Sequence, residues 1–126
     1  MCRRFASVSY QAAGRHVHAH ATRELRAMGA FETFLRSVPG LDVRVIDSSC
    51  CGMAGAFGYG RDTIDVSFAM AELSLFPALR KADPDDLVVA DGTSCRHQIH
   101  DGLGRDAVHV ARVLDAALAG RGAASP

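Results

Sequence analysis

The stretch Leu41-Asp-Val-Arg-Val-Ile46, followed by Asp-Ser-Ser-Cys50-Cys51-Gly52-Met-Ala-Gly55, largely determines the fold expected for this chain. Its first half alternates apolar and polar residues and is rich in β-branched side chains, which predicts a strand. Its second half opens a glycine-rich run that continues to Gly60 and predicts a loop. A strand that runs into a loop and then into a helical pattern is the repeating unit of a parallel α/β sheet.

The same alternation continues along the rest of the chain. Strands are expected at 15–20, 41–46 and 86–90, with at most a short strand at 107–109, and helices at 22–38, 61–79, 94–102 and 110–118. Asp62 and Ser94 are expected to cap two of these helices, and Pro77 to kink or end the second helix. The prediction is an α/β fold: a small, mostly parallel, Rossmann-like sheet with helices on both faces.

Length and charge narrow the classes of function. The 126 residues fit one domain, which we place at 14–119, between a weakly patterned segment 1–13 and a tail 120–126. Lys plus Arg and Asp plus Glu number 14 each, so no basic excess indicates nucleic-acid binding. No apolar run reaches membrane-span length and no signal peptide is evident, so a cytoplasmic location is expected. Cysteines in that compartment indicate metal binding or catalysis rather than disulfides.

Residues with metal-binding chemistry follow the expected strands. His18 and His20 end the first strand, Cys50 and Cys51 follow the second, and Cys95 follows the third. Because the carboxyl ends of parallel strands meet at one edge of a sheet, these side chains are expected to share that edge.

The local sequence around the cysteines favours a bound metal or cluster. Adjacent cysteines such as Cys50 and Cys51 cannot form an ordinary disulfide without strain, but both can bind one centre if glycines let the backbone wrap around it. Gly52 and Gly55 would present backbone amides to an anion or to cluster sulfides. Cys95 is expected in the first turn of a helix, where the helix dipole favours a thiolate.

The remaining histidines and Cys2 are expected to have no role in this site. His16 fits an exposed polar strand face, and His97 and His100 fit a solvated helix face. His109 opens the last helix and is expected to be structural. No nucleophile motif with a matching base is present to indicate a hydrolase.

Three motifs together resemble the cysteine-rich "CCG" domain found in heterodisulfide reductases and in glycolate oxidase iron-sulfur subunits. They are His16-Val-His18-Ala-His20, Cys50-Cys-Gly-Met-Ala-Gly-Ala-Phe-Gly58 and Gly92-Thr-Ser-Cys95-Arg-His-Gln98-Ile99. The likeness is strongest to the C-terminal part of FAD-linked oxidases of 2-hydroxyacids that carry iron-sulfur modules. It covers residues 14–119.

This resemblance implies an iron-sulfur cluster, or zinc, bound by Cys50, Cys51 and Cys95, with His18 or His20 completing the shell or handling a proton. It implies electron transfer in or beside a flavin-linked 2-hydroxyacid oxidase, as a subunit or fragment that binds no flavin itself. The partner would be a flavoprotein or a ferredoxin-like iron-sulfur subunit, and any membrane association would be indirect, through a respiratory partner.

The chain departs from the full CCG pattern at two positions. The pattern has a cysteine where this chain has Ala19, and another where it has Gly92. Replacing Ala19 with cysteine is therefore expected to restore a ligand. Two alternatives stay open: a degenerate or zinc-holding structural module without redox activity, and a thiol-redox protein that uses Cys50 and Cys51.

Overall fold

The computed structural model describes residues 15–20, 28–48 and 50–122. The elements, in chain order, are β1 (Arg15–His20), α1 (Met28–Arg36), β2 (Leu41–Val45), the 3-10 turn η2 (Phe57–Tyr59), α2 (Ile64–Glu72), α3 (Leu75–Lys81), β3 (Leu87–Ala90), α4 (Thr93–Leu103), β4 (Ala107–Val108) and α5 (Val110–Gly122). The expected segment 1–13, the beginning of the helix at 22–38 and the last four residues of the tail lie outside the described residues.

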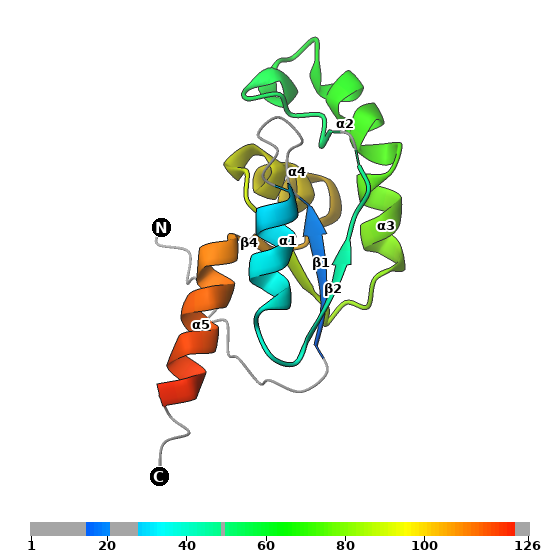
Figure 1. Ribbon diagram of the computed structural model, residues 1–126. Coiled ribbons are helices and arrows are strands. Elements are labelled where there is room, and N and C mark those ends of the chain that lie inside the picture. The colour runs from blue at the N-terminus through cyan, green and yellow to red at the C-terminus, as the bar shows by residue number, and fades with distance from the viewer. Residues whose placement is uncertain (1–14, 21–27, 49, 123–126) are drawn as a thin grey trace.

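The strands form one four-stranded sheet in the order β2-β1-β3-β4, and every neighbouring pair is parallel. In the centre, His18 of β1 is in register with Arg44 of β2 and with Val88 of β3. The strand order reverses between β1 and β3, which is the position where parallel α/β sheets bind ligands beyond their carboxyl ends. The α/β prediction is confirmed (Figure 1).

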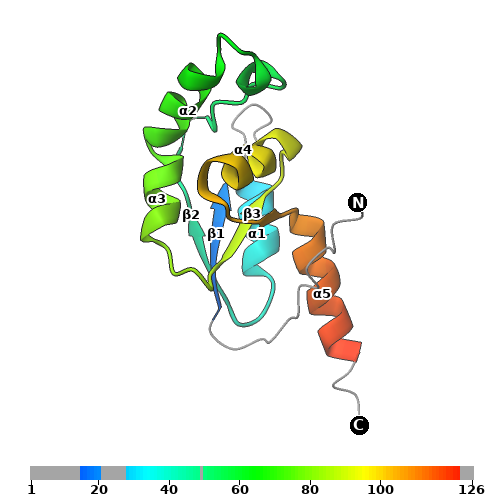
Figure 2. The same cartoon turned by 180° about the vertical axis from the view of Figure 1, so that it is seen from behind.

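The sheet divides the core into two layers, as expected for helices on both faces. Figure 1 views the sheet from the side of α1, and Figure 2 views it from behind, from the side of α4. Strand side chains alternate between the two faces, so Val17 and Ala19 point to one layer while His18 points to the other. The layer with α1 and α5 contains Val17, Ala19, Phe31, Leu35, Val43, Val89 and Val113. The layer with α2, α3 and α4 contains Ile46, Cys51, Met53, Ala71, Leu75, Phe76, Leu79, Val88, Ala90, Cys95 and Ile99.

The expected single helix at 61–79 is two helices. α2 ends at Glu72 and α3 begins at Leu75, with Pro77 in the first turn of α3. Proline has no amide hydrogen and its ring clashes with the carbonyl four residues earlier, so the helix is interrupted before Pro77. The cap residue is Thr63 rather than Asp62.

The turn that leads into α4 also differs from the prediction. Gly92 is the cap residue and Ser94 lies inside the helix, where its hydroxyl donates a 3.2 Å hydrogen bond to the carbonyl of Gly55. That bond ties the glycine-rich loop to the start of α4 at the carboxyl edge of the sheet. Within the described part of the chain, no helix has the length and apolarity needed to cross a membrane.

Candidate functional site: a buried cysteine pair at the carboxyl edge of the sheet

Cys51 and Cys95 meet in the core, although 44 positions separate them in the sequence. Their sulfurs lie 3.1 Å apart, with Cys95 donating to Cys51. The two side chains are 3% and 1% exposed, respectively. The prediction that the loop after β2 and the helix after β3 bring their cysteines to one edge is therefore confirmed for this pair.

Cys50 lies beside the pair but is less deeply buried. It is half-buried, and its sulfur accepts a 3.2 Å hydrogen bond from the amide of Gly52. It lies close enough to Cys95 to be the smallest of the causes that raise the pKa of Cys95. None of these three cysteines is part of a disulfide.

The protonation of Cys95 is opposite to the sequence-based expectation. The hydrogen bond to Cys51 is the largest cause that raises the pKa of Cys95 far above that of an ordinary thiol, and burial adds to it. Cys95 does lie in the first turn of α4, as predicted. The hydrogen bond to Cys51 and burial favour its protonated thiol, which is opposite to the effect of the helix dipole.

Gly52 has a packing role at this site. Its φ of +90° is unfavourable for residues with a Cβ, and a Cβ there would lie 2.1 Å from the carbonyl oxygen of Ser67 in α2. Gly55 also has a positive φ, +69°, but a Cβ there would meet no atom within 4 Å. Gly52 therefore lets the loop that carries Cys50 and Cys51, called the cysteine loop, lie against α2, whereas the positive φ of Gly55 reflects the turn and not a close packing contact.

Gln98 is an important residue at this site that sequence reasoning missed. Its side chain is 2% exposed, and its amide nitrogen donates to the carbonyl of Cys51 at 3.0 Å and to the hydroxyl and carbonyl of Ser67 at 2.9 and 3.2 Å. Gln98 therefore joins α4, the cysteine loop and α2. Its position one turn after Cys95, on the same helix face, is the feature of the sequence that could have indicated a role beside the cysteines.

Arg96 fixes the turn between β3 and α4, which leads to Cys95. Its guanidinium donates to the carbonyls of Ala90 and Asp91, both at 2.8 Å, where β3 ends. A second nitrogen donates to the hydroxyl of Thr93 at 3.0 Å. These bonds hold the turn between β3 and α4 and so position Cys95.

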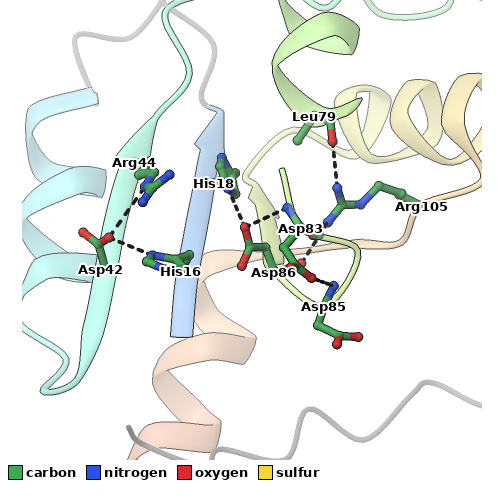
Figure 3. Close-up of polar contacts among 9 residues, drawn as sticks. All are labelled: His16, His18, Asp42, Arg44, Leu79, Asp83, Asp85, Asp86 and Arg105. Carbon is green, nitrogen blue, oxygen red and sulfur yellow. Dashed lines mark hydrogen bonds and ion pairs between the residues drawn. The ribbon is translucent and has the colours of Figure 1, made fainter. Parts of the chain in front are cut away.

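His18 is bound on the side of the sheet that faces α3. Figure 3 shows its ring directed to Asp86, just before β3, with His18 Nε2 2.9 Å from Asp86 Oδ2. The same carboxylate oxygen accepts the amide of Asp83 at 3.2 Å. Among the described residues, the His18 ring thus contacts a carboxylate rather than a cysteine. The side chain of His20 lies outside the described part of β1.

The other histidines have local partners, in agreement with their expected minor roles. His16 lies 2.7 Å from Asp42 on an exposed part of the sheet, with Arg44 nearby (Figure 3). His97 pairs with Tyr59, and His100 lies 3.1 Å from Asp106. His109 accepts the amide of Ala111 in the first turn of α5 and is structural, as predicted.

The two positions that depart from the CCG pattern lie in different environments. Ala19 is 1% exposed and packs in the layer with α1 and α5, on the opposite side of the sheet from the cysteine pair. The expectation that a cysteine at position 19 would restore a ligand is therefore wrong for this arrangement. A Cβ on Gly92, in contrast, would lie 3.1 Å from the sulfur of Cys95.

The donor types around the cysteine pair are those that a thiophilic metal centre uses. Thiols are donors that iron and zinc prefer, and one carboxylate oxygen of Asp91 is buried without a hydrogen-bond partner among the described residues. Asp91 lies close enough to Cys95 to help raise its pKa. The described residues hold no preassembled group of three or more His, Cys, Asp or Glu side chains that would bind a metal ion.

Comparisons with known proteins connect the chain to dehydrogenases. It is 36% identical over 85 residues to a subunit of the anaerobic glycerol-3-phosphate dehydrogenase of Escherichia coli K12, and the match covers 68% of this chain and 21% of the relative. It is 37% identical over 60 residues to the D-2-hydroxyglutarate dehydrogenase of Pantoea ananatis, and that match covers 48% of this chain and 6% of the relative. No family model matches, and no solved structure matches.

The chain thus spans at most about a fifth of the length of these relatives. Both relatives are dehydrogenase proteins, which is consistent with the resemblance to the CCG domain. The chain is thus an α/β domain that is similar to parts of two dehydrogenase proteins.

Proposed function

We propose that this chain is the cysteine-cluster module of an iron-sulfur oxidoreductase. Cys50, Cys51 and Cys95 would hold an iron-sulfur cluster at the carboxyl edge of the sheet. The observation that carries the proposal is the buried contact between Cys51 and Cys95, which joins the loop after β2 to the first turn of α4. When bound, such a cluster supplies one-electron transfer.

The chain's own residues prepare the pocket for a metal. Gln98 and Arg96 fix the two loops that carry the thiols, and burial of the sulfurs excludes water. Because thiols bind metals as thiolates, Cys95 must release its proton on loading. Gly52 contributes by letting the cysteine loop lie against α2, and Gly55 remains a candidate for presenting its amide to the bound group.

His18 or His20 is proposed to complete the ligand shell. Histidines that bind metals usually donate their second ring nitrogen to a carboxylate. Asp86 already holds Nε2 of His18 in this way, so Nδ1 is the ring nitrogen that would face a metal. His20 is the alternative donor, because it lies closer to the carboxyl end of β1.

The proposed place of the module is beside a flavoprotein or a ferredoxin-like iron-sulfur subunit in the cytoplasm, with any membrane association made through that partner. The names of the relatives support a dehydrogenase context, and the resemblance to FAD-linked oxidases supports a 2-hydroxyacid as the ultimate electron donor. The chain would pass electrons as a subunit or fragment and bind no flavin itself.

A second candidate function is a zinc-holding or metal-free structural module. One observation favours its metal-free form: Cys51 and Cys95 are buried among the apolar side chains of the layer with α2, α3 and α4. In that case the cysteine pair would serve as a small apolar contact between the loops and α2.

Anaerobic reconstitution with iron and sulfide tests the proposal. Wild type is expected to gain iron, sulfide and broad visible absorption, and Cys51→Ser to lose most of them, because thiolates dominate affinity at such sites. Cys2→Ser is the control and is expected to match wild type. Stoichiometric zinc in a colourless protein would support the second candidate, and equal iron in wild type and Cys51→Ser would remove Cys51 from the site.

A further inference from the structure

The contact between Cys51 and Cys95 has the geometry of a dithiol close to bond formation. Neither residue is part of a disulfide, and their sulfurs lie 3.1 Å apart. A disulfide needs a separation of about 2.05 Å, so the sulfurs must approach each other by only about 1 Å. Rotation of the side chains and a small loop adjustment supply such a shift.

The surroundings hold the two sulfurs as a pair. Gln98 fixes the backbone of Cys51 through its carbonyl, and Arg96 fixes the turn before Cys95. Cys50 is oriented differently, because its sulfur accepts the amide of Gly52 and because it is adjacent to Cys51 in the chain. The pairing is thus selective for Cys51 with Cys95.

Access to the pair is limited to small molecules. The two side chains are nearly inaccessible to solvent, which excludes a bulky disulfide such as oxidised glutathione as the direct reagent. A peroxide is far smaller than such a disulfide, and Cys50, next to Cys51 in the chain, is only half-buried. Holding the reactants in place raises the rate of the second, intramolecular step.

We propose that Cys51 and Cys95 are a redox-active dithiol that closes to a disulfide when a peroxide oxidises the metal-free chain. Cys95 donates toward Cys51, so Cys51 is the attacking sulfur: it displaces hydroxide from hydrogen peroxide and becomes a sulfenic acid. Cys95 then attacks the Cys51 sulfur, the S–S bond forms, and the S–O bond breaks. The two thiols lose two electrons to the peroxide, and their two protons leave in the two water molecules formed.

The disulfide would remove two of the three thiols from metal binding, and reduction would return them. The inference needs only the thiol pair, so it does not rest on the proposed iron-sulfur function. It also replaces the pair in the thiol-redox alternative. Cys50 and Cys51 are adjacent, so a disulfide between them would be strained, whereas Cys51 and Cys95 come from a loop and a helix whose sulfurs already meet.

The test uses the full chain with Cys2→Ser, treated with a chelator and then with one equivalent of hydrogen peroxide. Remaining thiols are blocked with N-ethylmaleimide, and peptides are mapped by mass spectrometry. Titratable thiols are expected to fall from three to one per chain, with a Cys51–Cys95 cross-link that dithiothreitol reverses. Cys50→Ser should keep the cross-link and the adjacent Cys51→Ser should lose it.

The mapped peptides decide the inference even if a variant fails to fold. A cross-link through Cys50, a cross-link between two chains, or sulfinic acid at Cys50 with intact Cys51 and Cys95 thiols would overturn it. Iron loading of the reduced chain is measured in parallel. A chain that closes the disulfide but takes up no iron supports this inference and refutes only the metal-binding proposal.

Discussion

Replacing Gly52 with alanine should destabilise the protein far more than replacing Gly55, although both glycines have a positive φ in the same loop. The two positions share the backbone cost, because alanine is unfavourable at φ of +90° and +69°. They differ in space: the new Cβ would lie 2.1 Å from the carbonyl oxygen of Ser67 at position 52 and would meet nothing within 4 Å at position 55. Gly55→Ala is thus a matched control for the steric part.

The expected magnitudes follow from these two contributions. A left-handed alanine costs about 1–2 kcal/mol, and the restricted unfolded chain returns about 0.5–1 kcal/mol, so Gly55→Ala should lose about 1 kcal/mol. The overlap with α2 forces the loop away from the helix, which should cost Gly52→Ala a further ~2 kcal/mol or more. For a chain of this size, about 1 kcal/mol corresponds to ~4 °C in Tm.

Urea unfolding of the reduced, metal-free chain measures both free energies of unfolding. Gly52→Ala should also disturb the cysteine pair, so its peroxide cross-link should form more slowly than in Gly55→Ala. Equal losses of stability in the two variants would show that the close approach of the loop to α2 is not what position 52 requires.

Three further predictions concern the surroundings of the cysteine pair and the turn before β3. Gln98→Met should keep the side-chain volume but leave the Cys51 carbonyl without its amide donor. The free energy of unfolding, measured by urea denaturation, should fall by about 2–3 kcal/mol, and a loss under about 0.5 kcal/mol would contradict this role. Gly92→Cys should raise iron content on reconstitution, because the new thiol would lie beside Cys95, whereas Ala19→Cys should leave iron content unchanged. The reverse result would mean that β1 presents position 19 to the cysteine pair. Arg105→Met removes donors to three carbonyls around the turn before β3 and should cost about 2 kcal/mol in thermal unfolding, and an unchanged Tm would refute it.

The sequence was sufficient to predict the sheet and the meeting of its loops. Alternating or β-branched runs marked the strands, and parallel pairing placed every loop that follows a strand on one edge. For this reason the sequence alone predicts that Cys51 and Cys95 lie at the same edge of the sheet, where the structure has them.

Features that depend on a neighbour distant in the sequence could not be predicted. The spacing from Cys95 places Gln98 on the same helix face, but its bond to the Cys51 carbonyl depends on where the cysteine loop lies. The protonated state of Cys95 requires knowing that Cys51 accepts its hydrogen, and helix position alone indicated the opposite. The side of the sheet to which Ala19 belongs required the register of β1 with its neighbours.

The alternation of β1 has a practical consequence for engineering this domain. Val17 and Ala19 belong to the packed layer under α1, whereas His16 and His18 interact with carboxylates on the other side. One strand in the middle of the sheet therefore carries two independent sets of positions. A library that varies only residues 16 and 18 would sample new polar chemistry beneath α3 while the hydrophobic layer on the far side stays as it is.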